Sequence, residues 1–87
     1  MRLRAIRSGT RRALTTGMTP DVWLYRNDVE TFRTVQRDNG DCTEVLVFGS
    51  HGERARERFT TSAAADAFRQ AVEARIMQRG FRIARRP

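Results

Sequence analysis

Between residues 21 and 60, apolar and polar residues follow the short period of β-strands, in four runs separated by turn residues. The runs cover 22–25, 30–37, 42–48 and 54–60, and the segments between them are rich in Asn, Asp, Gly and Ser. Such spacing predicts an antiparallel meander of four strands.

The second and third runs flank Asn39-Gly40, the strongest short hairpin signal in the chain, because a type I′ turn needs positive φ at both central positions. A two-residue turn at this place predicts a register in which Val35 lies opposite Glu44.

The next hairpin has two candidate loops. A two-residue loop at His51-Gly52 would place arginines beside buried valines, which costs more than a looser turn. We therefore expect a three-residue loop, 50–52, with Val47 opposite Ala55.

Residues 62–79 have the period of an amphipathic helix, with apolar side chains every four residues at Phe68, Val72 and Ile76. Ser62 is the expected N-cap, and Asp66 is expected in the first turn, where it would complement the helix dipole. Gly80 suits the position after the C-cap, with Phe81 packing back on the helix.

The predicted fold class is therefore α+β, a four-stranded antiparallel meander sheet with one C-terminal helix packed on one face (ββββα). Residues 21–83 form its single domain, between a flexible basic segment (1–20) and a basic tail (84–87). Trp23 faces the helix if the first turn has two residues, and the opposite side if the turn is one residue longer. The expected core contains Phe32, Val45, Val47, Ala55, Phe59, Phe68, Val72, Ile76 and Phe81.

Charge is distributed unevenly along the 87 residues, which have a formal net charge of +7 and contain arginine but no lysine. The first 20 residues include five arginines and no acid, and residues 82–87 include three more arginines, whereas the segment between them is close to neutral. Basic character at the two ends is consistent with a polyanionic partner.

The opening stretch, MRLRAIRSGTRRALTTGM, has three interpretations. It is a basic arm that contacts phosphates, a mitochondrial presequence, or sequence upstream of a true start at Met18. We favour the start at Met18, because the first strand follows it almost immediately.

Enzymatic and metal chemistry find no support in the sequence. Nucleophilic catalysis by a cysteine–histidine pair would require contact between Cys42 and His51, the only cysteine and the only histidine. They lie at opposite ends of one predicted strand, about 30 Å apart. Asp38 and Asp41 are explained by turn chemistry. We expect no catalytic residues, no cofactor, no bound metal and no small-molecule substrate.

No apolar run approaches the about 20 residues that span a membrane, and the single cysteine suits the reducing cytoplasm.

The face of the sheet away from the helix is the most informative surface. The predicted registers place one aromatic and five arginines on it, and these are the candidate nucleic-acid-binding residues: Arg33, Arg37, Arg54, Arg56, Arg58 and Phe48. Guanidinium groups bind phosphate bidentately and stack on bases, so DNA or RNA is the expected partner.

Two other interpretations of this face stay open. In one, it is a solvated face with cross-strand ion pairs such as Glu44–Arg58. In the other, the patch formed by Val35, Leu46 and Phe48 binds a protein partner or a second copy of the chain.

The segments FGSHGER, RFTTSAAADAF and RGF resemble a WGR domain in layout, although Phe48-Gly49-Ser50 stands in place of Trp-Gly-Arg. The segment RERFTTSAAADAFRQAVEARI is similar to the arm-binding module of phage-type integrases. Both resemblances imply contact with DNA, and the chain is assigned to neither family.

Overall fold

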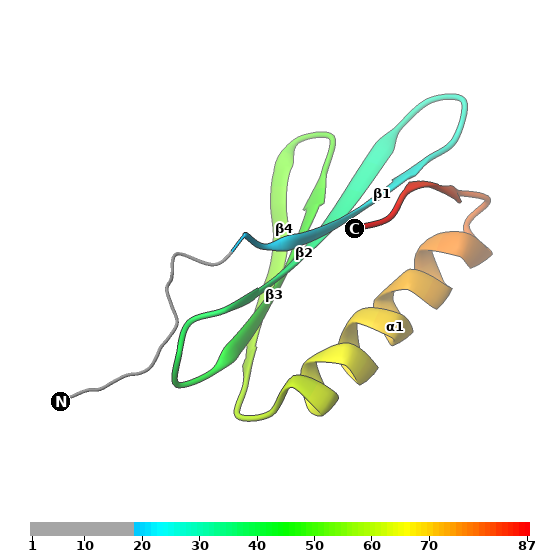
Figure 1. Cartoon of the computed structure of the whole chain (residues 1–87). Helices are drawn as coiled ribbons and strands as arrows, with labels where there is room; N and C mark the ends of the chain where they lie inside the picture. Colours follow the sequence, from blue (N-terminus) through cyan, green and yellow to red (C-terminus); the bar gives the residue numbers. More distant parts are fainter. Residues whose placement is uncertain (1–18) are drawn as a thin grey trace, which may run out of the picture.

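The structure, a computed structural model, describes residues 19–87, which form a five-stranded antiparallel sheet with one helix on one face (Figure 1). The strands are β1 (Asp21–Arg26), β2 (Thr31–Asp38), β3 (Thr43–Gly49), β4 (Gly52–Phe59) and β5 (Arg82–Arg85), and the helix is α1 (Ser62–Gln78). The predicted α+β fold is confirmed. The three interpretations of the opening stretch fall on residues outside the described part and stay predictions.

The fifth strand is the main addition to the predicted topology. The sheet order is β4-β3-β2-β1-β5, so the chain returns after α1 and pairs β5 with the outer edge of β1. This strand could not be predicted from periodicity, because four residues are too few to show a period. It includes Ala84 and Arg85, which the predicted domain boundaries assign to the basic tail.

The loop between β2 and β3 has four residues instead of the predicted two, so the predicted register is wrong by two residues. Asp38 pairs with Thr43, and Val35 lies opposite Leu46 instead of Glu44. A slip of two leaves every side chain on its predicted face, so the hydrophobic pattern cannot detect it. Gly40 adopts the expected positive φ of 92°.

The loop between β1 and β2 also has four residues, and its length decides the orientation of Trp23. Asn27 closes the loop by accepting hydrogen bonds from two backbone N–H groups, at 2.8 and 2.7 Å. Tyr25 consequently pairs with Phe32, and both lie on the helix side of the sheet. Trp23, two residues earlier on β1, lies on the same side and packs against the core.

The hairpin of β3 and β4 follows the predicted register, with Val47 opposite Ala55. Beyond this pair the register shifts at a bulge next to Val47, and Gly49 lies opposite Gly52. The predicted three-residue loop is therefore wrong, because only residues 50 and 51 lie between the two strands. The bulge inserts Arg54 into β4 without a partner. An extra residue of this kind bends the strand and re-aims its own side chain.

The ends of α1 differ in how well they were predicted. Thr61, not Ser62, is the N-cap, and its hydroxyl accepts a hydrogen bond from the backbone N–H of Ala64 at 3.1 Å. Asp66 consequently lies beyond the first turn. The C-terminal end is as expected, because Gly80 has a φ of +93° and donates its N–H to the carbonyl of Met77 at 3.0 Å.

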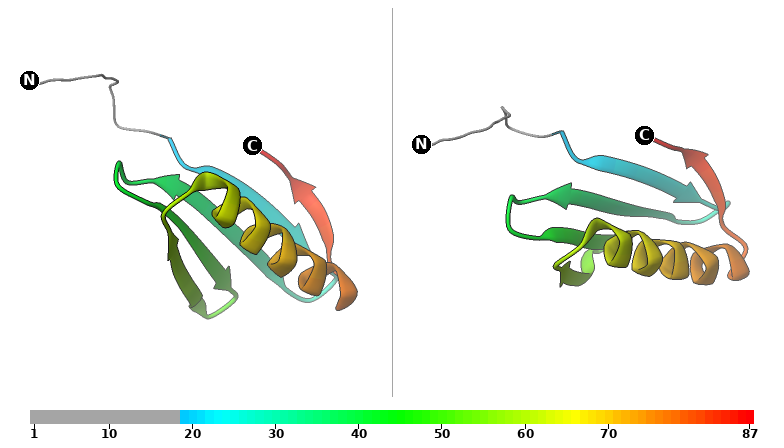
Figure 2. Two further views of the ribbon diagram at one scale, coloured as in Figure 1. Left: turned by 90° about the horizontal axis from the view of Figure 1, so that it is seen from below. Right: turned by 60° about the horizontal axis from the view of Figure 1, so that its bottom comes forward.

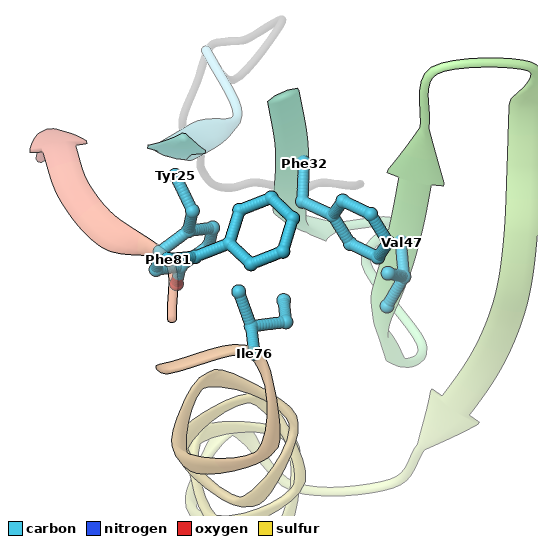
Figure 3. Packing of buried hydrophobic residues seen from close by; sticks show 5 residues of the cluster. All are labelled: Tyr25, Phe32, Val47, Ile76 and Phe81. Atoms are coloured by element: carbon cyan, nitrogen blue, oxygen red, sulfur yellow. The ribbon is translucent and has the colours of Figure 1, made fainter. Parts of the chain in front are cut away.

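The core lies between α1 and the sheet, and Figure 3 shows the five side chains at its centre. Phe32 and Phe81 meet edge to face, with ring centroids 5.1 Å apart. Ile76 approaches from the helix and Val47 from β3. Tyr25, absent from the predicted core, is fully buried among them.

A buried polar network joins β1 to the helix beside this core. Arg69 lies 3.9 Å over the ring of Trp23 and donates hydrogen bonds to the Tyr25 hydroxyl (3.2 Å) and to Glu73 (3.0 Å). The Tyr25 hydroxyl in turn donates to Glu73 at 2.8 Å. Burial by itself would raise the pKa of Glu73, but hydrogen bonds from Tyr25 and Arg69 bring this pKa below its ordinary value.

Candidate nucleic-acid interface

Within the described residues, the side of the sheet opposite α1 carries no other element (Figure 2), and we call it the open face. Because Tyr25 points at the helix, its neighbours on β1 point the other way, and the registers extend this alternation across the sheet. The charged side chains of the open face are Arg26, Arg33, Arg37, Glu44, Glu53, Arg56, Arg58, Arg82 and Arg85.

Three of the predicted arginines surround one carboxylate. The side chain of Glu44 is only 1% exposed, and Arg37 approaches it to 2.9 Å, Arg58 to 3.4 Å and Arg56 to 3.7 Å. We call this set the Glu44 cluster. The structure thus brings together these predicted residues, and their guanidinium groups already have a carboxylate partner.

The apolar side chain next to the Glu44 cluster is buried as well. Leu46 is 4% exposed although it lies on the open face, opposite Val35 on one side and Arg56 on the other. Arginine stems can pack over apolar side chains while their charged ends stay in water. The predicted patch of Val35, Leu46 and Phe48 is therefore not a continuous exposed apolar surface.

Arg33 and Phe48 form a second group, separate from the Glu44 cluster. They lie opposite each other, and the Arg33 guanidinium carbon is 4.4 Å from the centroid of the Phe48 ring. A hollow of about 180 Å³ opens beside them, and it is also lined by Leu24, Thr31, Gly49, Ser50 and Gly52.

Arg54 does not lie with the other candidates. The β4 bulge turns its side chain to the helix side, where its guanidinium carbon is 5.9 Å from the Phe32 centroid. Arg79, at the C-cap of α1, approaches the same ring at 6.0 Å. The predicted placement of Arg54 on the open face is wrong, because strict alternation along a strand fails at a bulge.

Three further arginines lie on the open face, although the sequence places none of them there and counts Arg82 and Arg85 only in the basic C-terminal end. Arg26 and Arg82 lie directly opposite each other on β1 and β5, and Arg85 lies opposite Leu24. No ion pair links any of these arginines, or Arg33, to a carboxylate in the described part of the chain. Arg26 directly follows the predicted strand 22–25, and only the unexpected β5 shows that it has cationic neighbours.

The single cysteine and the single histidine do not lie together. Cys42 and His51 lie in the loops at the two ends of β3, and Asp38 accepts a hydrogen bond from the backbone N–H of Gly40 (2.9 Å). Among residues 19–87, no group of three or more His, Cys, Asp or Glu side chains is placed to hold a metal. In the same residues, no helix has the length and apolar character needed to cross a membrane.

Because of the Glu44 cluster, the free energy of unfolding is expected to fall at acidic pH. The hydrogen bond from Arg37, with further ones from Arg58 and Asn39, holds the pKa of Glu44 below its ordinary value of 4.5. Folding therefore gains stability from ionised Glu44 above about pH 4.5, and this gain disappears as the pH falls through the lower folded-state pKa.

We expect Glu44→Gln to lower the urea midpoint at pH 7 and to flatten its decline between pH 5 and about pH 3, as measured by circular dichroism. The decline should not vanish, because the pKa of Glu73 is lowered too. Glu57→Gln is the matched control, since Glu57 is exposed on the other side of β4. Equal effects of the two substitutions would contradict the special position of Glu44.

No protein-family model matches the chain, and comparison with curated proteins and with solved structures finds no significant match. The resemblances to WGR domains and to integrase arm-binding modules thus receive no support from whole-chain comparison.

Proposed function

We propose that this protein is a non-enzymatic module that binds nucleic acid through the open face of its sheet. The observation that supports the proposal is the charge of this face. Seven arginines lie on it against two glutamates, and one of the arginines stacks on Phe48.

The chemistry of this face suits a phosphodiester chain better than most other partners. Guanidinium forks bind phosphate oxygens with two parallel hydrogen bonds and also stack on flat rings. Because the chain contains no lysine, each cation on the face is an arginine and has both abilities. An aromatic ring on a cationic sheet is also a common platform for unpaired bases.

The test is a titration of the full chain into a fluorescently labelled 12-nucleotide strand, followed by anisotropy at several salt concentrations. Three to four phosphate contacts would lower the affinity roughly 20- to 50-fold between 50 and 200 mM salt. A flat salt response, or no binding at about 50 mM salt, would exclude the proposed function.

The same titration with a chain that starts at Met18 measures what the five arginines before it contribute. Equal folding by circular dichroism with lost affinity would identify the opening stretch as a functional arm. Equal folding and equal affinity would leave the interface to residues 18–87.

Self-association is the competing function. The outer edge of β4 has no strand partner in the described part of the chain, and such an edge can pair with another chain. Charged side chains follow this edge from Glu53 to Arg58, which is typical of strands that avoid pairing. Sedimentation at several concentrations separates the two functions, because a monomer that binds the labelled strand fits only the first.

A further inference from the structure

We infer that the bound nucleic acid is single-stranded and that one corner of the open face holds it, where β5, β1 and β2 lie side by side. This corner, which we call the free-arginine corner, contains Arg26, Arg33, Arg82 and Arg85, with Phe48 and the hollow beside them. The inference rests on the proposed function. Of the residues in this corner, only Arg33 and Phe48 are among the nucleic-acid-binding candidates predicted from the sequence.

The Glu44 cluster is a poor phosphate site because its arginines are already engaged. Arg37 donates a hydrogen bond from Nε to one oxygen of Glu44 at 3.0 Å, and its Nη2 forms an ion pair with the same oxygen at 2.9 Å. A phosphate that drew the arginines away would leave an almost fully buried carboxylate without cations. Leaving a buried charge unpaired is strongly unfavourable. The cluster therefore holds the sheet face together instead of binding a ligand.

The free-arginine corner has the opposite electrostatic character. Arg26 and Arg82 are directly opposite each other on adjacent strands, an arrangement that destabilises a sheet when the charges are alike. No carboxylate of residues 19–87 is within ion-pair distance of either arginine. A phosphate between them would replace repulsion with two attractive contacts, which is why we assign the first phosphate contact to this pair.

The geometry extends the site from this pair towards Phe48. Leu24 is two residues before Arg26 on β1, about 7 Å away, and it lies between Arg85 on one neighbouring strand and Arg33 on the other. Arginine residues thus occupy two successive rows across the sheet. An extended strand can lay successive phosphates over these rows.

The hollow is the reason we infer a single strand rather than a duplex as the ligand. Its lining combines the apolar side chain of Leu24 with the ring of Phe48 and the stacked guanidinium of Arg33. An unpaired base can stack on a guanidinium plane or on an aromatic ring, and each such stack contributes about 1–3 kcal/mol. A duplex keeps its bases in its own stack and would use only the phosphate contacts.

The experiment compares Arg26→Gln/Arg82→Gln with Arg54→Gln/Arg79→Gln in the anisotropy titration. Both double variants remove two exposed cations, but the second removes them from the helix side of the sheet. We expect the first to weaken binding of the labelled strand about 10-fold or more at 50 mM salt and to reduce the salt slope by about 1.4. The second should change the affinity less than about 3-fold.

Folding is not expected to obscure the result. Arg26→Gln/Arg82→Gln removes a repulsion, so its melting temperature should equal or exceed that of the parent chain. Arg58→Gln, which leaves Glu44 with Arg37 and Arg56, should retain most of the affinity. The duplex of the same sequence should bind more weakly than the single strand.

The outcomes separate the inference from the proposed function. Salt-dependent binding that survives Arg26→Gln/Arg82→Gln but is lost in Arg58→Gln would overturn the inference and spare the function. Equal losses in the two double variants, or tighter binding of the duplex, would also overturn the inference. Absence of any binding by the parent chain would overturn both.

Discussion

Arg69→Ala is expected to lower the free energy of unfolding by about 2–4 kcal/mol, somewhat less than the cost of breaking a fully buried ion pair, because the Glu73 side chain left behind is 22% exposed. The Arg69 residue is 7% exposed, and its guanidinium joins Trp23, Tyr25 and Glu73. Without it, the carboxylate of Glu73 keeps only the Tyr25 hydroxyl as a donor. A domain of this size has a total stability of about 3–10 kcal/mol, so the variant should be close to unfolding.

Urea unfolding followed by far-ultraviolet circular dichroism measures the effect, and Arg75→Ala is the control. Arg75 is an exposed arginine on the same helix, and its replacement should change stability by about 0.5 kcal/mol or less. Arg69→Met/Glu73→Leu should recover much of the loss, because a buried pair can often be exchanged for apolar side chains of similar volume. Equal costs for Arg69→Ala and Arg75→Ala would contradict the structural role of the network.

Raising the pH from below 10 to above 12 is expected to cost the fold about 2–3 kcal/mol through a single group, the phenol of Tyr25. Burial, followed by the effects of Glu73, raises the pKa of Tyr25 to about 12, against an ordinary value of 10.0. The folded protein thus holds this proton more tightly than the unfolded chain. The contribution of this group to the free energy of unfolding is fully present below pH 10, and it is lost as the pH rises through the folded-state pKa.

The composition of the chain makes this titration unusually clear. Tyr25 is the only tyrosine, and the chain has no lysine that would titrate in the same range. Ultraviolet absorbance of the phenolate should show a midpoint near pH 12 in the folded protein and near pH 10 in concentrated urea. Tyr25→Phe, which lacks the phenol, should lose little stability over this interval, and a folded-state midpoint near pH 10 would refute the prediction.

Much of the fold was predictable because it depends on local periods. The alternation along residues 21–60 and the four-residue spacing of Phe68, Val72 and Ile76 correspond to the four strands and the helix that are observed. Gly80 also lies where a helix end requires positive φ. Turn lengths were less predictable, because a two-residue and a four-residue loop at Asn39-Gly40 leave every side chain on the same face.

The buried network illustrates what apolar periodicity misses. Arg69 and Glu73 are four residues apart on α1, and a pattern of charges at this spacing usually indicates a solvent-exposed pair. In the folded protein they lie against the sheet because Tyr25 and Trp23 provide a hydroxyl and a ring for them. The pairing requires β1 and α1 to meet, which residues so far apart in the chain do not reveal.

The candidate nucleic-acid interface was also predictable only in part. Period two placed Arg33, Arg37, Phe48, Arg56 and Arg58 on the open face, and the registers show them there. The position of Arg54 could not be obtained in this way, because a bulge changes the alternation by one residue. Arg82 and Arg85 could not be obtained either, because β5 is recognisable only by its partner β1.

The sequence by itself determined the order of the first four strands and the helix, the face that each regular strand position occupies, and the concentration of positive charge near the chain ends. These properties follow from steric periods of two and 3.6 residues and from composition, and both are local. The tertiary structure decided which arginines meet a carboxylate and which meet one another. Such pairings depend on loop length, on the bulge and on the return of β5 to β1, and these are set by long-range packing and charge complementarity between distant segments.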